Sequence, residues 1–409
     1  MLVYLFVILL NTVLVCHYDI GGGIKYKSFW YRLVLVVLIL VAGLRYRVGA
    51  DSIVYTYDFY HTVPELSKID FSEIFIQKYE PGFFLLLSLV KTMGLRFYVV
   101  NFIQALIVNV LVFKYIKKHS AFPYAVVWLY TLYLYTIFNY EEMRSSISLV
   151  FALFGNDYIL SKKWIKGIFL YLLGAMFHYS VLIMLIIPFA MFLKMNTFGY
   201  MLMIMALAFG YLLQHIFADY LALFEFNAHL SEKASFYANS ENKIEQQLPL
   251  WAISLVKIPY LLYCVFSVSY IKRHIVQCKN LIRFEPFIVL GLMFVLMSIP
   301  MPIFYRFARY FEFYFLLVFA NAFAGLVRNN IRKMKTLALV RAFVFFVPLL
   351  NAISYNYRHT ISESTSTHKI YHYQKLYPYC SIIEKGIDHD REYFFKSWAV
   401  VSYPSPNEY

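Results

Sequence analysis

Apolar runs long enough to form membrane-spanning helices recur from the N-terminus to residue 353, and they constrain the fold more than any other feature. A helix crosses the hydrocarbon core of a bilayer with about 20 apolar residues. We therefore predict spans at residues 2–16, 31–44, 97–113, 121–139, 145–160, 198–217, 251–271, 284–302, 304–323 and 336–353. Residues 166–193 are long for one span and break at residues 177–180, which favours a short hairpin.

Composition supports a membrane protein and excludes a soluble enzyme. Hydrophobic residues make up 61% of the 409 residues and charged residues only 15%. A soluble domain contains about 45–50% apolar and about 25% charged residues, so one globular core could not bury this excess. The four cysteines lack the spacing of a metal or redox site. We expect no metal and no cofactor.

Residues 82–93 are apolar but too short to cross a bilayer comfortably. Pro81 suits a first helical position, and Glu80 suits the positive end of a helix. We therefore predict a re-entrant half-helix that starts and ends on the outer side, its ends covered by protein or a water-filled cavity. The alternative is a conventional crossing, which would leave the basic residues 114–118 outside. With the half-helix, the chain is an all-α polytopic membrane protein with about 12 transmembrane helices and both termini outside.

The charge distribution predicts the sidedness of the chain. The connections rich in Lys and Arg contain one acidic residue, Asp19, and such connections stay in the cytoplasm. Carboxylates gather in the opposite connections, namely loops 45–80 and 218–250 and the turn at Glu141 and Glu142. The net charge of +14 then indicates attraction to anionic lipid, not to nucleic acid. We expect a transmembrane domain at residues 1–353 and a polar, Tyr-rich tail at residues 354–409.

The first candidate site follows the second span, in the stretch LRYRVGAD. Arg45 and Arg47 stand at the outer end of a span, where positive charge is unusual. A guanidinium presents a planar fork that matches phosphate oxygens, so a diphosphate is a suitable partner. Asp51 is a candidate base. The structural alternative is a solvated span end in which Arg47 pairs with Asp51.

Two further candidates open helices on the outer side. Glu80 could act as a base at the rim of a cavity, although helix capping alone could explain it. Arg144 begins an apolar helix, where a cation opposes the helix dipole and needs an anionic partner. Neutralisation by Glu141 or Glu142 is the structural alternative for Arg144.

The remaining candidates lie at an outer hairpin turn and at a late helix start. His178 could accept a proton from a hydroxyl, because imidazole titrates near neutral pH, although a lone histidine is more often structural. Arg306 and Arg309 share one helix face and could bind phosphate. They could equally extend to lipid headgroups in an interfacial aromatic belt.

Taken in order, these elements resemble the EpsG family of exopolysaccharide and capsule polymerases, which is related to the Wzy-type polymerases. The resemblance covers roughly residues 30–325. Its elements are an RxxVGxD-like stretch at Arg45, EPGF at Glu80, an Arg-led helix at Arg144, FHxS at His178 and a late Arg/Tyr helix start. It implies a glycosyltransferase-C-like, all-helical enzyme of the bacterial cytoplasmic (inner) membrane. Such an enzyme joins oligosaccharide repeat units carried on undecaprenyl diphosphate at the outer face, in exopolysaccharide, capsule or O-antigen biosynthesis.

This resemblance assigns expected roles to the candidates. Arg45, Arg47, Arg144 and either Arg306 or Arg309 would hold the lipid diphosphate. Asp51, Glu80 or His178 would take the proton of the acceptor hydroxyl, and the sequence does not choose among them. The expected partners are the undecaprenyl-diphosphate-linked glycan, the lipid bilayer and other polysaccharide-export proteins, such as a flippase and a chain-length regulator.

Other functions are compatible with parts of this pattern. A flippase for lipid-linked oligosaccharide would also use about twelve spans and cavity arginines, but it should show paired halves with charges deep in both. An O-antigen ligase or another lipid-dependent glycosyltransferase would differ only in its acceptor. An acyltransferase would need a nucleophile or a His/acid pair that the sequence does not reveal, and a structural scaffold would not need so many outward arginines.

Overall fold

The computed structural model describes residues 2–220, 250–301, 303–331, 360–362, 370–371 and 379–383, apart from residues 71, 73 and 76. Within these residues the chain is a predominantly helical membrane protein, as predicted. Most of the predicted loop 218–250, the predicted span 336–353, the boundary at residue 354 and most of the tail lie outside the described residues.

The contacts within the chain divide it into two compact units. The first comprises residues 1–182, 327–332 and 352–409. Its elements are α1 (Leu2–Leu14), η1 (Val15–Ile20), α2 (Lys27–Gly43), α3 (Ala50–His61), η2 (Leu66–Lys68), α4 (Pro81–Thr92), α5 (Tyr98–His119), α6 (Pro123–Leu129), η4 (Tyr130–Leu134), η5 (Ile137–Glu141), α7 (Met143–Leu160), α8 (Trp164–Ala175), β1 (Thr360–Ser362) and β2 (Ile370–Tyr371). The two short strands pair antiparallel.

The second unit comprises residues 183–326 and 333–351. It holds η6 (Tyr179–Ile186, which begins in the first unit), α9 (Ile187–Ala190), α10 (Thr197–Tyr220), α12 (Leu250–His274), η8 (Val276–Phe284), α13 (Glu285–Met297), α14 (Phe304–Ala308) and α15 (Glu312–Ile331, which ends in the first unit). The predicted single span at 304–323 is thus two helices. A new helix starts at Glu312, whose carboxylate favours the positive end of α15.

Four described helices are long and apolar enough to cross a membrane: Leu2–Ile20, Tyr98–His119, Thr197–Gln214 and Val276–Met297. Shorter apolar helices cover Pro81–Thr92, Pro123–Leu134, Trp164–Ala175 and Tyr179–Ala190. The break between the last two matches the predicted interruption at residues 177–180. The total of about twelve spans and the glycosyltransferase-C-like arrangement stay predictions.

The long helices of the first unit run between two ends with different chemistry. Helices α2 and α5 are antiparallel, since Tyr31 near the start of α2 donates a 2.9 Å hydrogen bond to the carbonyl of Phe113 near the end of α5. Helices α7 and α8 are also antiparallel, because Ser148 on α7 bonds to the carbonyl of Gly174 at the end of α8. We call the end where α2 and α8 finish the site end. The opposite end, where α2 and α8 begin, is the basic end.

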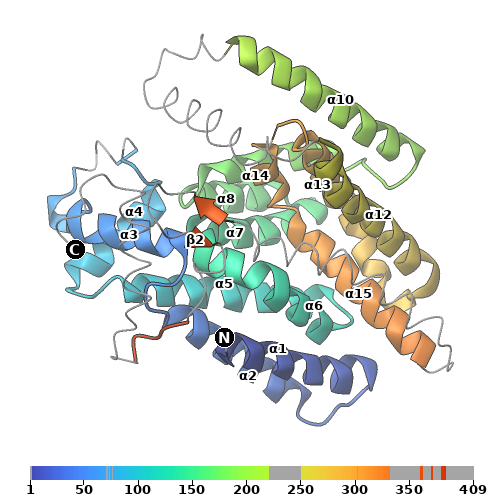
Figure 1. Cartoon of the computed structure of the whole chain (residues 1–409), viewed down its shortest axis with the longest axis horizontal. Helices are drawn as coiled ribbons and strands as arrows, with labels where there is room; N and C mark the ends of the chain where they lie inside the picture. Colours follow the sequence, from blue (N-terminus) through green and yellow to red (C-terminus); the bar gives the residue numbers. More distant parts are fainter. Residues whose placement is uncertain are drawn as a thin grey trace. The chain divides into compact units, whose positions relative to one another are not determined.

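Helix α4 lies at the site end, together with α3 (Figure 1). Its first turn is tied to the end of α8, because Gly82 donates a 2.7 Å hydrogen bond to the carbonyl of Met176. Its last turn is tied to the end of α3, where Lys91 donates to the carbonyl of Val63 at 2.6 Å. Phe97, just before α5, is fully buried in an apolar cluster that also contains Val63 and Phe83. Both ends of α4 therefore lie at one end of the unit, and its re-entry into the membrane as a half-helix stays a prediction.

Candidate functional site

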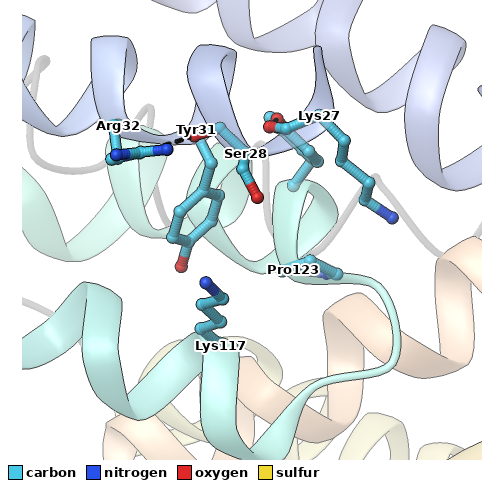
Figure 2. A pocket seen from close by; sticks show the side chains of 7 residues that line it. Lys27, Ser28, Tyr31, Arg32, Lys117 and Pro123 are labelled. Carbon is cyan, nitrogen blue, oxygen red and sulfur yellow. Dashed lines mark hydrogen bonds between the residues drawn. The ribbon is translucent and has the colours of Figure 1, made fainter. Parts of the chain in front are cut away.

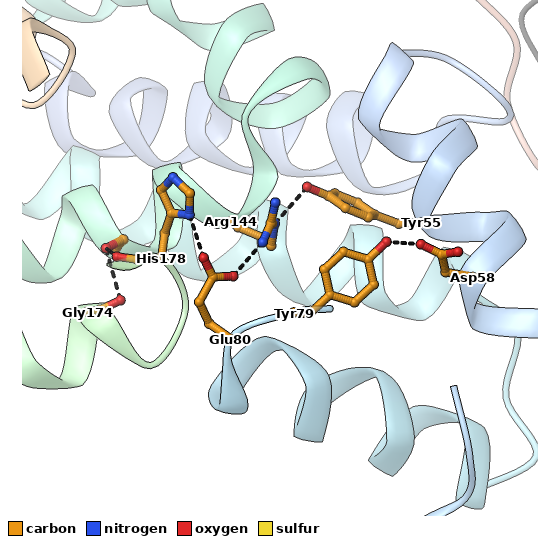
Figure 3. Close-up of polar contacts among 8 residues, drawn as sticks. Tyr55, Asp58, Tyr79, Glu80, Arg144, Gly174 and His178 are labelled. Carbon is orange, nitrogen blue, oxygen red and sulfur yellow. Dashed lines mark hydrogen bonds and ion pairs between the residues drawn. The ribbon is translucent and has the colours of Figure 1, made fainter. Parts of the chain in front are cut away.

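The side chains of Glu80, Arg144 and His178 meet at the site end, although they come from three separate segments (Figure 3). Glu80 precedes α4, Arg144 lies in the first turn of α7, and His178 follows α8. One carboxylate oxygen of Glu80 lies 2.8 Å from Nδ1 of His178, and the other binds the guanidinium of Arg144. The structure thus brings together three of the predicted site residues around one carboxylate.

A serine side chain and a close backbone approach hold the three segments together. Ser148, one turn after Arg144, donates hydrogen bonds to the carbonyls of Gly174 and His178 at 2.9 and 3.2 Å. A glycine is required at position 82, because a Cβ there would lie 2.8 Å from the carbonyl oxygen of Met176. The Gly of the EPGF stretch therefore allows the start of α4 to approach the end of α8, which brings Glu80 to His178.

Aromatic side chains form the wall around Arg144. Its Nε donates a 2.9 Å hydrogen bond to the hydroxyl of Tyr55, and its guanidinium lies 5.1 Å from the ring centre of Tyr79. Tyr79 in turn bonds to Asp58, which also forms a 2.7 Å ion pair with Lys78. No pattern in the sequence indicated a contact between Asp58 and Lys78. The contact depends on the packing of α3 against the segment before α4.

The electrostatics of the cluster keep Glu80 ionised. Glu80 is only 6% exposed and lies outside the membrane-spanning helices. Burial raises its pKa, but the hydrogen bond from His178 and the positive charge of Arg144 outweigh burial and lower the pKa to about 2. A carboxylate of such low basicity accepts a proton poorly at neutral pH. Its chemical role is to orient the imidazole and hold the guanidinium.

Arg45 has a different position from the one expected of a diphosphate ligand. The side chain is 0% exposed, and it donates to the carbonyls of Ala42 and Val48 and to the side-chain oxygen of Asn101. Its guanidinium also lies 5.0 Å from the ring centre of Tyr140. Full burial leaves no exposed surface on this side chain, and a role for Arg45 in diphosphate binding stays a prediction. Arg45 stabilises the turn between α2 and α3.

The rest of this turn includes the other two candidates from the same stretch. Arg47 is half-buried with φ of 50°, and its guanidinium lies 5.3 Å from the ring centre of Tyr46. Gly49 adopts φ of 93°, and a Cβ there would approach Tyr140. Asp51 lies in the first turn of α3, and its side chain is outside the described residues. Its pairing with Arg47 stays a prediction.

Arg306 and Arg309 belong to the second unit. Arg306 is exposed, whereas Arg309 forms a 2.7 Å ion pair with Glu312 and lies 4.8 Å from the ring centre of Tyr305. Arg309 lies in the turn after α14, which ends at Ala308, so Arg306 and Arg309 do not share one continuous helix as predicted. Their role in diphosphate binding stays a prediction. Among the described residues, no group of three or more His, Cys, Asp or Glu side chains could hold a metal ion.

The fold and the cluster define a helical membrane protein in which a carboxylate, an imidazole and a guanidinium converge at one end of a helical unit. The sequence model of the EpsG family matches residues 28–379, which is most of the chain. The chain therefore belongs to the EpsG family, and the resemblance found in the sequence is confirmed. Membership implies a polymerase-type membrane protein of exopolysaccharide synthesis with a glycosyltransferase-like activity. No curated protein and no solved structure shows a significant match to the chain.

Proposed function

We propose that this protein joins oligosaccharide repeat units carried on undecaprenyl diphosphate at the outer face of the bacterial cytoplasmic membrane. The family supports the class of reaction. The observation that carries the proposal is the bridging position of Glu80, which binds His178 on one oxygen and Arg144 on the other. This arrangement supplies a base for a hydroxyl and a cation for a leaving phosphate.

In the proposed reaction, the acceptor hydroxyl of the incoming unit attacks the sugar carbon that links the growing glycan to its lipid diphosphate. The new glycosidic bond forms, and the bond from that carbon to the phosphate oxygen breaks. The diphosphate leaves with the bonding electrons. The proton of the acceptor hydroxyl goes to Nε2 of His178, because Nδ1 faces the Glu80 carboxylate. We therefore propose His178, and not Glu80, as the base, and Asp51 stays the alternative because its side chain lies outside the described residues.

Arg144 is suited to stabilise the charge that develops on the diphosphate. Its side chain is 23% exposed, so a ligand can reach it, whereas Arg45 is fully enclosed. The guanidinium has five N–H donors in a planar fork, and its Nε and Nη1 are oriented by Tyr55 and Glu80. Fixed donors aimed at developing charge lower a barrier without reorganisation during the reaction.

The position of the cluster supports an outward-facing site. Basic residues at the opposite end include Lys27 at the start of α2, Lys117 near the end of α5 and Lys163 before α8. Positively charged connections favour the cytoplasm, so the end with Glu80, Arg144 and His178 would face outward.

The decisive experiment is reconstitution of the purified protein in liposomes with lipid-linked repeat units and no other enzyme. Longer glycans on a gel, at one released lipid diphosphate per new linkage, would support polymerisation. Movement of the lipid-linked unit between leaflets without longer glycans would instead support the flippase alternative. Transfer only to a separate outer acceptor, such as a lipid A core, would support a ligase.

A further inference from the structure

A cavity with basic side chains in its lining lies at the basic end of the first unit, opposite the site end (Figure 2). Its volume is about 350 Å³. The start of α2, the end of α5 and the start of α6 enclose it, and its lining residues are Lys27, Ser28, Tyr31, Arg32, Lys117, Pro123 and Tyr124. None of these residues takes part in the reaction proposed above.

The walls of this basic cavity are held by hydrogen bonds and ring contacts. Tyr124 donates its hydroxyl hydrogen to the carbonyl of Lys27, which ties α6 to α2. Tyr31 donates to the carbonyl of Phe113 at 2.9 Å, which ties α2 to α5. The rings of Tyr31 and Tyr124 meet edge to face, with centres 5.6 Å apart. The packing of these three helices therefore forms the cavity.

The charge in the cavity is positive and only partly compensated. Lys27 Nζ lies 3.8 Å from a carboxylate oxygen of Asp19. Arg32 donates its Nε to the carbonyl of Ser28 at 3.2 Å, and Figure 2 shows the ammonium of Lys117 pointing toward Tyr31. No carboxylate of the described residues lies within 4.0 Å of the Arg32 or Lys117 nitrogens. The N-terminal end of α2 adds a partial positive charge.

Exposed apolar side chains are close in sequence to the lining residues Lys27 and Ser28. Ile24, Tyr26 and Phe29 are 84%, 75% and 56% exposed, and they lie immediately before or within the first turn of α2. Aromatic and aliphatic side chains beside a basic pocket are typical of the membrane interface, where headgroups and acyl chains meet. A freely dissolved anion has no apolar group that could contact these exposed side chains.

We propose that the basic cavity binds the phosphate diester of an anionic phospholipid headgroup. Arg32 supplies the planar fork for the phosphate oxygens, and Lys27 and Lys117 supply further positive charge. The acyl chains lie along the exposed side chains of Ile24, Tyr26 and Phe29. Inorganic phosphate shares the chemistry of the headgroup but lacks the chains, so the two sources can be separated by experiment.

The test uses the full-length protein in detergent and measures bound lipid by native mass spectrometry during titration with phosphatidylglycerol, with phosphatidylcholine as the neutral comparison. The test variant is Arg32→Gln/Lys117→Gln. The matched control is Lys162→Gln/Lys163→Gln, which removes two exposed cations near the basic end but outside the cavity. We expect the test variant to bind phosphatidylglycerol about thirtyfold more weakly, since each cation near an anionic headgroup contributes about five- to sixfold. The control should change less than about twofold.

Three results would overturn the proposal. Equal weakening by the test and control variants would indicate general charge attraction instead of a site. Equal binding of phosphatidylcholine would show that the anionic headgroup is not recognised. Displacement of phosphatidylglycerol by millimolar inorganic phosphate would assign the cavity to a free anion. A variant with Ser28→Leu, which fills the cavity without changing charge, should also release the lipid while the protein stays folded by circular dichroism.

Discussion

Nδ1 of His178 lies 2.8 Å from the carboxylate of Glu80, although 98 residues separate the two in the chain. The contact joins the turn after α8 to the start of α4. It fixes which imidazole nitrogen faces the protein and leaves Nε2 for a substrate. Several predictions for the proposed transfer depend on this relationship and on Arg144, the other partner of Glu80.

Replacing His178 should remove the base while the fold is retained. In His178→Asn the side-chain amide can still donate to Glu80, but it cannot accept a proton, so we expect elongation to fall by about 10²–10⁴-fold. The measurement is the rate of glycan elongation by purified protein in liposomes. His61→Asn changes an exposed histidine at the end of α3 and should retain most activity. Near-normal elongation by His178→Asn would exclude His178 as the base.

The planar geometry of the Arg144 guanidinium should be required as well as its positive charge. Arg144→Ala should abolish elongation, and Arg144→Lys should recover little of it, because an ammonium cannot reproduce the contacts to Tyr55 and Glu80 together. Glycan ladders beside a protein blot separate lost activity from lost protein. Arg96→Ala removes an exposed arginine between α4 and α5 and serves as the control. An unchanged ladder for Arg144→Ala would remove this residue from the site.

The ionisation of Glu80 predicts a specific effect of pH on stability. Its folded-state pKa of about 2 lies below the ordinary value of 4.5, so the ionised carboxylate stabilises the folded protein above about pH 4.5. That contribution is lost as the pH falls from about 4.5 toward about 2. The difference in thermal stability between wild type and Glu80→Gln should therefore be constant from pH 7 to pH 5 and shrink below pH 4.5. A difference that disappears already by pH 6 would contradict the ionised pair.

Arg45 should be needed for folding more than for substrate binding. Arg45→Ala removes a fully buried guanidinium and leaves the carbonyls of Ala42 and Val48 without their donor. We expect a loss of about 3 kcal/mol or more in the free energy of unfolding, measured by denaturant titration in detergent. The fraction that folds should retain its KM for the lipid-linked unit. A raised KM at unchanged stability would support Arg45 as a substrate ligand.

Much of the framework could be predicted from local sequence, because spans depend on apolar length and helix starts depend on residues such as Pro81. The ends of α2, α5 and α7 fall within a few residues of the predicted limits, apart from the last turns of α5. The break between α14 and α15 differs from the single span predicted at residues 304–323. No proline or glycine separates Ala308 from Glu312, so composition alone could not reveal it.

The partners within the site could be predicted only in part. Glu80, Arg144 and His178 stood out because charges beside apolar helices need compensation. The expected carboxylate partners of Arg144 were its neighbours Glu141 and Glu142, whereas the structure places Glu80 against it. Burial of Arg45 was unpredictable for a related reason. Its acceptor on Asn101 comes from a helix that is distant in sequence, so only the packing of α2 with α5 decides the contact.

The central claim is that the Glu80–His178–Arg144 cluster transfers glycan from a lipid diphosphate. The most direct measurement is single-turnover release of undecaprenyl diphosphate from a labelled lipid-linked unit by purified protein, followed together with linkage formation. We expect one diphosphate released per new linkage by the wild type and almost none by His178→Asn. Release at the wild-type rate by His178→Asn, or movement of the lipid between leaflets without release, would contradict it.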